Sequence, residues 1–225
     1  MKNYTHILFD ADNTLFDFNL AEKTAVKMTF KSYGYDIDDE ICDYYHNLND
    51  VYWKKLEKKE ITQKELSYKR FEEMFTRYGY SLDPSAFNAS YKENLGKQNF
   101  LIKNAETTLN YLKGLGKILI IASNGSKSVQ FNRIKTSKIA SYIDFIYTSE
   151  DAGITKPNRM FFDKLFDEYK LNKDTSLLVG DSESADILGG YNYNIDTVYF
   201  NPIKLQSDIA TYNIDDLLQL KNIIK

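Results

Sequence analysis

Short, almost continuously apolar runs alternate with segments of helical length through most of this 225-residue chain. Five such runs have the composition of strands, at residues 5–9, 118–122, 145–148, 176–179 and 197–200. Four intervening segments have helical patterns, and the one at 126–138 shows a polar outer face; they are 105–115, 126–138, 159–169 and 185–193. Strands that are apolar throughout are buried on both faces, which is typical of parallel sheets. The alternation therefore predicts an α/β fold, with a Rossmann-like parallel sheet covered by helices on both faces.

Residues 18–95 interrupt this alternation and contain almost no strand pattern. Thr62-Gln63-Lys64-Glu65 has the form of a capping box, Gly79 stands where that helix should end, and Asp83-Pro84 is a second helix start. We expect a bundle of about four helices here. The predicted domains are an α/β core of residues 1–17 and 96–225 and a helical cap of residues 18–95. The cap could also be a structural insertion that makes no contact with a ligand.

Chemically active side chains follow the ends of four of the predicted strands. In chain order they are Asp10, Asp12, Ser123, Asn124, Lys156, Asp181 and Asp186. Right-handed crossovers bring the carboxyl ends of parallel strands to one edge of the sheet, where α/β folds bind ligands. Each group alone could be an ordinary loop, turn or helix cap. Their shared position at successive strand ends favours one common site.

The chemistry of this predicted site favours a metal ion and a phosphoryl group. Converging carboxylates repel one another, and a hard divalent cation with oxygen ligands relieves that repulsion. Mg2+ suits a site with few carboxylates, bound water and a substrate phosphate. Ser123, backbone N–H groups at the following helix start and the ammonium group of Lys156 could hold phosphate oxygens. We therefore expect phosphoryl transfer with Mg2+ as the cofactor.

The same residues resemble the four motifs of the haloacid dehalogenase-like hydrolases. The family pattern DxDxT matches residues 10–14, its Ser/Thr matches Ser123, its Lys matches Lys156, and its GDxxxxD pattern matches residues 180–186. The helical insertion also falls where that family places its cap domain. Within the family the chain resembles the YjjG-like pyrimidine 5'-nucleotidase branch. That likeness rests on the segments FDADNTLFDF, SNG, SEDAGITKPN and GDSESADILGG.

This resemblance implies a mechanism through an aspartyl phosphate. Asp10 is implied to be the nucleophile, and Asp12 the acid and then the base. Dehalogenases and phosphonatase-like members lack an acid at the position of Asp12, and transport ATPases have Thr there. Asp12 therefore favours ester hydrolysis, although a mutase would also keep it.

The resemblance also implies which residues bind the metal and the phosphate. The metal would be held by the Asp10 and Asp181 carboxylates and the Asp12 backbone carbonyl. Asp186 is implied to lie just outside the metal ligands or to reach the ion through water. Ser123, Asn124 and Lys156 are implied to hold the phosphoryl group.

The resemblance implies a small phosphorylated substrate, namely a pyrimidine nucleoside 5'-monophosphate such as UMP, dUMP or dTMP. A broad-range sugar-phosphate or phosphoglycolate phosphatase is the alternative within enzymes. Aromatic residues of the helical segment could stack on a base, but we expect them in its core; they include Tyr44, Tyr45, Tyr52 and Trp53. Outside enzymes, a phospho-receiver-like signalling module or a catalytically inactive binding protein remain as alternatives.

Composition narrows the partners and the compartment. The formal charge is -3 and Lys and Arg form no dense run, so we expect no binding to nucleic-acid polymers or to membranes. One cysteine, Cys42, and two histidines, His6 and His46, exclude a Cys- or His-rich metal site. The N-terminus does not have the form of a signal peptide, and no apolar run reaches the length of a membrane span. We expect a cytoplasmic protein, as a monomer or a homodimer.

Overall fold

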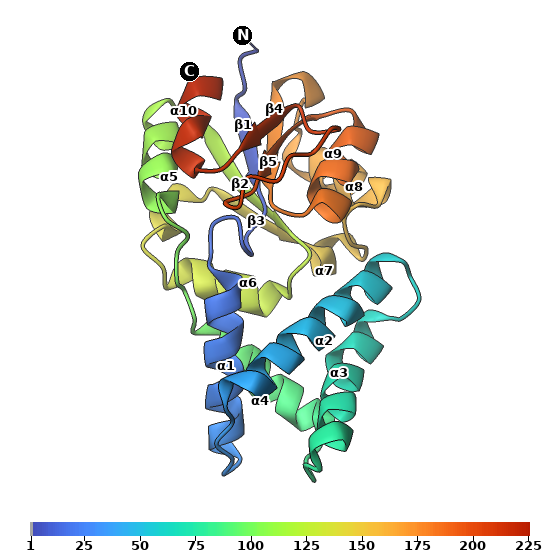
Figure 1. Ribbon diagram of the computed structural model, residues 1–225. Helices are drawn as coiled ribbons and strands as arrows, with labels where there is room; N and C mark the ends of the chain where they lie inside the picture. Colours follow the sequence, from blue (N-terminus) through green and yellow to red (C-terminus); the bar gives the residue numbers. More distant parts are fainter. Residues whose placement is uncertain (1) are drawn as a thin grey trace. The chain divides into compact units, whose positions relative to one another are not determined.

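The computed structural model describes residues 2–225, and their contacts divide them into two compact units. The α/β unit consists of the chain up to Asp17 together with Asn99–Lys225, and the helical unit is Phe18–Gln98 (Figure 1). The sequence prediction placed the second boundary three residues earlier, after residue 95. Each unit has its own core.

The α/β unit contains the predicted parallel sheet. Within residues 2–225, six strands are ordered β3-β2-β1-β4-β5-β6, and all neighbouring pairs are parallel. The strands are β1 (His6–Phe9), β2 (Ile118–Ser123), β3 (Phe145–Thr148), β4 (Ser176–Gly180), β5 (Asp196–Phe200) and β6 (Tyr212–Ile214). The first five confirm the strands predicted from sequence. The prediction missed β6, which is three residues long and buries only Ile214, so that it has no continuous apolar run.

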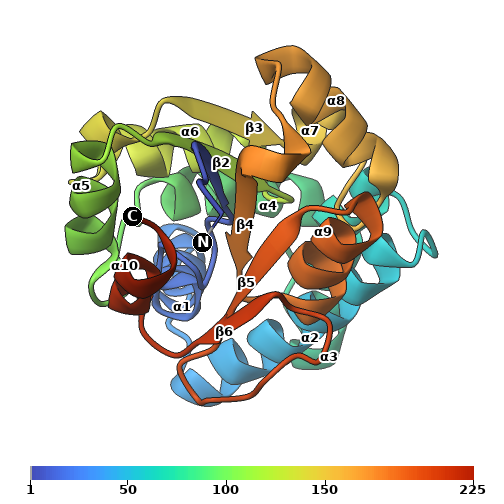
Figure 2. The ribbon, with the colours of Figure 1, turned by 90° about the horizontal axis from the view of Figure 1, so that it is seen from above.

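Helices cover both faces of the sheet, as predicted (Figure 2). They are α5 (Ala105–Gly114), α6 (Lys127–Lys135), α7 (Ser149–Ala152), α8 (Arg159–Tyr169), α9 (Leu188–Tyr193) and α10 (Leu220–Ile223). Short 3-10 segments lie at η1 (Ala140–Tyr142), η2 (Lys173–Thr175) and η4 (Leu217–Gln219), and a π-helical turn lies at η3 (Glu183–Ile187).

Alternate residues of each strand enter two separate cores, one on each face of the sheet. Along β1, Ile7 and Phe9 join a cluster that includes side chains of α5 and α10. Leu8 joins the other cluster, which is closed by the aromatic residues Phe161 and Phe162 of α8. Because apolar side chains cover both faces of the sheet, polar reactive groups can gather only at the strand ends.

The helical unit consists of four helices, as expected for the insertion. They are α1 (Phe18–Ser32), α2 (Asp39–Glu57), α3 (Gln63–Tyr78) and α4 (Pro84–Gly96). The predicted capping box forms between Thr62 and Glu65 at the start of α3, and Gly79 ends that helix in the left-handed conformation. Asp83 caps α4, with Pro84 in its first turn.

Aromatic side chains build the core of the helical unit. Tyr45 is fully buried and stacks on Phe71 with ring centroids 5.1 Å apart, and Tyr52 is also buried. Tyr44 contacts Tyr78 edge to face. These contacts agree with the expectation that the aromatic residues of this segment serve mainly as core. Among residues 2–225, no helix combines the length and apolar character needed to cross a bilayer.

Candidate active site

The loop that follows β1 carries two of the predicted site residues, Asp10 and Asp12. The backbone N–H of Asp10 donates to the carbonyl of Val179 in β4 at 2.9 Å, which extends the sheet to the end of β1. Beyond it the chain turns tightly, with Asn13 at a φ of 55° in the left-handed region that asparagine tolerates. The turn brings Thr14 to Asp181, where its hydroxyl donates to Asp181 Oδ1 at 3.0 Å.

Lys156 lies at the centre of the site and is only 1% exposed. Its Nζ donates to Asp10 Oδ1 at 2.7 Å, to Asp186 Oδ1 at 2.5 Å and to the Ala122 carbonyl at 2.5 Å. These three bonds use the three protons of the ammonium group. Burial alone would lower the pKa of Lys156, but the two carboxylates outweigh it and raise that pKa above its usual range. Lys156 is therefore positively charged and fixed in direction.

A third carboxylate, that of Asp181, lies close to the two that accept from this ammonium group. Oxygen atoms of Asp10, Asp181 and Asp186 lie within 4.8 Å of one another. Burial raises the pKa of Asp10 to about 7, although the charge of Lys156 opposes the shift. Burial, and then the carboxylates of Asp10 and Asp186, raise the pKa of Asp181 well above its usual range. Negative charge is in excess here, and ionising all three acids is costly without a further cation.

The donor set of this cluster fits a hard divalent ion. The cluster presents carboxylate and carbonyl oxygens, and Mg2+ prefers oxygen ligands of this kind. Asp186 is already engaged, because one oxygen accepts from Lys156 and the other from the Ser182 backbone N–H at 3.1 Å. The carboxylates of Asp10 and Asp181 are the better candidates for direct contact with an ion.

Ser123 and Asn124 stand at the end of β2 and before α6. Ser123 Oγ accepts from the Gly125 N–H at 3.0 Å, and its own hydroxyl proton can be donated to a ligand. The Asn124 side chain instead pairs twice with the backbone of Lys156: its Nδ2 donates to that carbonyl at 3.0 Å, and its Oδ1 accepts from that N–H at 2.8 Å. Asn124 thus fixes the loop that carries Lys156.

Two further residues, which the sequence did not single out, contact Asp12. Arg133 of α6 donates from a terminal guanidinium nitrogen to Asp12 Oδ1, and Gln130 Nε2 donates to Asp12 Oδ2 at 2.6 Å. Both are buried, so the predicted polar outer face of this helix does not include them. Their spacing of three places them on one helical face with Val129 and Ile134, and this was the available signal.

The structure therefore brings all seven predicted site residues to one edge of the sheet, as members of linked hydrogen-bonded groups. Lys156 joins Asp10 and Asp186, and Asn124 holds the backbone of Lys156. Gln130 joins Asp12 to Ser123, to whose Oγ it donates at 3.3 Å. Asp181 is tied to the β1 loop through Thr14. A charged, oxygen-rich cluster of this kind can hold a cation and offer a carboxylate to an electrophile.

Comparison with known proteins places this site in a family. The sequence profile of the haloacid dehalogenase-like hydrolases matches residues 7–200, which is well over half of the chain. The chain is 33% identical to pyrimidine 5'-nucleotidase PynA of Streptococcus pneumoniae, over 99% of this chain and 98% of that protein. It is 32% identical to pyrimidine 5'-nucleotidase YjjG of Escherichia coli, over 87% of this chain and 85% of that protein.

A solved structure supports the same placement. The crystal structure of the HAD-hydrolase YfnB of Bacillus subtilis, bound to magnesium and described as revealing interdomain movement, matches with a TM-score of 0.92 and 29% identity. The match covers all of both chains. With the profile match and two relatives above 30% identity, the predicted resemblance is confirmed. This chain belongs to the haloacid dehalogenase-like hydrolases.

Proposed function

We propose that this hydrolase is a magnesium-dependent phosphomonoesterase that acts through an aspartyl phosphate on pyrimidine nucleoside 5'-monophosphates. The observation that carries the proposal is the cluster of Asp10, Asp181 and Asp186, in which Asp10 and Asp186 share the one ammonium group of Lys156. The relatives PynA and YjjG, both named pyrimidine 5'-nucleotidases, support the choice of substrate. The magnesium in the YfnB crystal structure supports the choice of metal.

In the proposed first step, a carboxylate oxygen of Asp10 forms a bond to phosphorus while the ester P–O bond breaks. Asp12 gives its proton to the departing alkoxide. In the second step a water oxygen bonds to phosphorus, Asp12 takes the water proton, and the bond between Asp10 and phosphorus breaks. The products are the alcohol and inorganic phosphate, and both aspartates return to their starting states.

The remaining residues orient the substrate and the nucleophile. Lys156 donates to Asp10 Oδ1, which would leave the other oxygen of that carboxylate available to attack phosphorus. Ser123 Oγ and the backbone N–H groups that precede α6, including that of Asn124, would hold phosphoryl oxygens. The carboxylates of Asp10 and Asp181 and the backbone carbonyl of Asp12 would hold Mg2+, which would supply positive charge to neutralise the phosphoryl group. Asp186 anchors Lys156 beside these ligands.

We further propose that the helical unit acts as a cap that excludes water and selects the leaving group. The interdomain movement described for YfnB supports a mobile cap. On the sequence grounds given above, we propose that the enzyme acts in the cytoplasm as a monomer or a homodimer.

The test is phosphate release from dUMP, dTMP, UMP, glucose 6-phosphate and phosphoglycolate. Each substrate is assayed with Mg2+, with a chelator and with the Asp10→Asn variant. We expect release only in the first condition, and fastest from the pyrimidine nucleotides. Faster release from the sugar phosphate or phosphoglycolate would refute the nucleotidase assignment but keep the phosphatase. Chelator-resistant hydrolysis would refute the role of the metal.

A further inference from the structure

Helix α6 sends two buried side chains to the carboxylate of Asp12, one to each oxygen. Arg133 is fully buried and donates to Oδ1, while Gln130 is 1% exposed and donates to Oδ2 at 2.6 Å. The Asp12 side chain itself is 26% exposed. The carboxylate is therefore held by hydrogen bonds from α6, while part of its surface remains accessible to solvent.

We propose that Gln130 and Arg133 are positioning residues that hold Asp12 in the orientation needed for proton transfer to the leaving group. The inference rests on the role proposed for Asp12. A carboxylate has about four lone-pair positions, so two bonds from α6 leave a position for the proton that Asp12 transfers to a substrate oxygen. A proton-transfer group must lie within hydrogen-bond reach of the atom it serves, and a misplacement of about 1 Å costs about 100-fold in rate.

The surroundings of Arg133 fix its own position. Its guanidinium group lies over the ring of Phe16, 4.6 Å from the ring centroid, and Phe16 is fully buried. Phe16 is part of the same β1 loop, where its N–H donates to the Ala11 carbonyl at 2.9 Å. Arg133 thus contacts the loop at two points, the Asp12 carboxylate and the Phe16 ring. A long flexible side chain held in this way transmits the position of α6 to Asp12.

Gln130 connects Asp12 to the residue proposed to hold the phosphoryl group. Its Nε2 donates to Asp12 Oδ2 at 2.6 Å and lies 3.3 Å from Ser123 Oγ. One amide group therefore spans the ends of β1 and β2. It sets the separation between the proton donor, which serves the bridging ester oxygen, and a hydroxyl proposed to hold the non-bridging oxygens of the same phosphoryl group.

The glycine of the Ser123-Asn124-Gly125 segment makes this arrangement possible. A Cβ atom at position 125 would collide with the amide nitrogen of Gln130 and lie 3.2 Å from its Cγ and Cδ. The φ angle of Gly125 is not among the positive ones, so space rather than backbone conformation requires glycine. Gly125 is needed because the Gln130 side chain passes there on its way to Asp12.

The test compares two substrates whose leaving groups differ in whether they need a proton to depart. An alkyl phosphate such as dUMP needs a proton on its departing oxygen, whereas 2,4-dinitrophenyl phosphate does not. Single-turnover rates isolate the ester-cleavage step from the later hydrolysis of the intermediate. For Arg133→Met and Gln130→Ala we expect a loss of about 100-fold on dUMP and less than about 10-fold on the dinitrophenyl ester. Asp12→Asn should show the same asymmetry with a larger loss.

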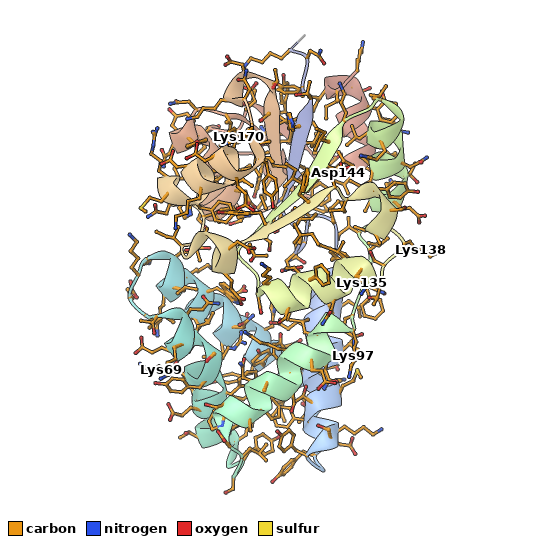
Figure 3. The ribbon with its side chains drawn as sticks, turned by 180° about the vertical axis from the view of Figure 1, so that it is seen from behind. Lys69, Lys97, Lys135, Lys138, Asp144 and Lys170 are labelled. Carbon is orange, nitrogen blue, oxygen red and sulfur yellow. The ribbon has the colours of Figure 1, made fainter. Side chains whose placement is uncertain are left out.

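Two control variants on α6 remove a basic and an amide side chain, as the test variants do, but at positions that do not hold Asp12. Lys135 and Asn132 are exposed on the same helix, and Lys135 is labelled in Figure 3. Lys135→Met and Asn132→Ala should change neither rate by more than about twofold, as surface substitutions usually do. Thermal melts of all variants report whether α6 still folds against the sheet.

A double-mutant cycle keeps the inference testable even if Arg133→Met fails to fold. Gly125→Ala alone should reproduce the asymmetric loss, because the new methyl group displaces Gln130. In the Gln130→Ala background the same change should cost almost nothing, since the side chain it displaces is gone. Additive losses in this cycle would overturn the role of Gln130.

Further outcomes separate the inference from the proposed function. If Asp12→Asn shows the leaving-group asymmetry while the folded Gln130 and Arg133 variants lose equally on both esters, the two residues are structural and the inference is wrong. If the wild-type protein cleaves neither ester, the proposed function fails and the inference fails with it.

Discussion

Both units of this protein bury ionisable side chains, but they differ in how the charges are matched. In the helical unit, Glu22 is 2% exposed and Arg70 is 5% exposed. Asn49 lies between them: it donates to Glu22 Oε1 at 2.6 Å and accepts from Arg70 at 2.5 Å. One buried acid thus meets one buried base through an amide. In the α/β unit, Asp10, Asp181 and Asp186 lie close together, and a single ammonium group, that of Lys156, pairs with two of them, Asp10 and Asp186.

The cluster of Glu22, Asn49 and Arg70, which we call the matched cluster, needs no bound ion to balance its charge. His46 Nδ1 lies 2.6 Å from Glu22 Oε2, and Arg70 also donates to Asn88 Oδ1 at 3.0 Å. Networks of this kind tie helices together and specify one packing arrangement. The unmatched cluster is different, because burial raises the pKa of two of its acids. Excess buried charge costs stability, and it persists where a cation is to be bound. The comparison therefore teaches that charge excess, rather than burial of charge, marks the site of chemistry.

The largest effect expected from this difference is on catalysis. Asp10→Asn should lower kcat on dUMP by about 10⁴-fold or more, because the nucleophile is removed. Glu22→Gln changes an acid that is also buried but matched, and should leave kcat per folded molecule within about threefold. Steady-state assays on both variants check this, with mass spectrometry to exclude deamidation of the introduced asparagine back to aspartate. A greater loss in Glu22→Gln than in Asp10→Asn would break the comparison.

Replacing the buried cation of each cluster by methionine should destabilise both units, but only one of them in a Mg2+-dependent way. Removing Lys156 from its buried ion pairs should cost about 3–5 kcal/mol, and removing Arg70 leaves buried amide acceptors without their donor. For Lys156→Met, Mg2+ should restore part of that loss by supplying positive charge to the three carboxylates, although activity stays low. For Arg70→Met, Mg2+ should restore no more than it adds to the wild-type protein. Urea unfolding with Mg2+ and with chelator measures both, and equal responses to Mg2+ would contradict the distinction.

The pH dependence of stability should differ between metal-free and Mg2+-bound protein. The folded-state pKa of Asp10 is raised to about 7, and that of Asp181 is raised as well, so the folded state binds protons more readily than the unfolded state. Their contribution is present below the unfolded pKa of about 4 and is lost as the pH rises through about 7. The rise in Tm caused by Mg2+ should therefore be larger at about pH 8 than at about pH 5. A pH-independent rise would contradict the assignment.

The smallest effect concerns His46 in the matched cluster. Its hydrogen bond to Glu22 raises the pKa of His46 above the usual value, although burial opposes the shift. The stability it contributes is present below the unfolded pKa of about 6.5 and is lost as the pH rises through the higher folded value. The stability difference between wild type and His46→Gln should shrink over that range. The effect is small because His46 is partly exposed and solvent screens its charge. Thermal melts at several pH values, all with Mg2+, measure it.

The sequence predicted the sheet and the convergence of its strand ends because both follow from local patterns. Apolar runs specify β1 to β5, and the chain order of Asp10, Ser123, Lys156 and Asp181 follows from the strands that carry them. The side chains that contact these residues could not be predicted from local patterns. Arg133 is a residue type usually found at the surface, and its burial depends on the position of Asp12, 121 residues earlier in the chain. The hydrogen bonds between the Asn124 side chain and the Lys156 backbone likewise form only in the tertiary structure, so local patterns do not predict them.

The most direct test of the charge-excess account is a calorimetric titration of Mg2+ into the metal-free protein at about pH 7.5. The account predicts one binding site in the wild-type protein. It predicts that Asp181→Asn loses this site and that Glu22→Gln keeps it with the wild-type affinity. Absence of binding to the wild-type protein, or undiminished binding to Asp181→Asn, would contradict the account.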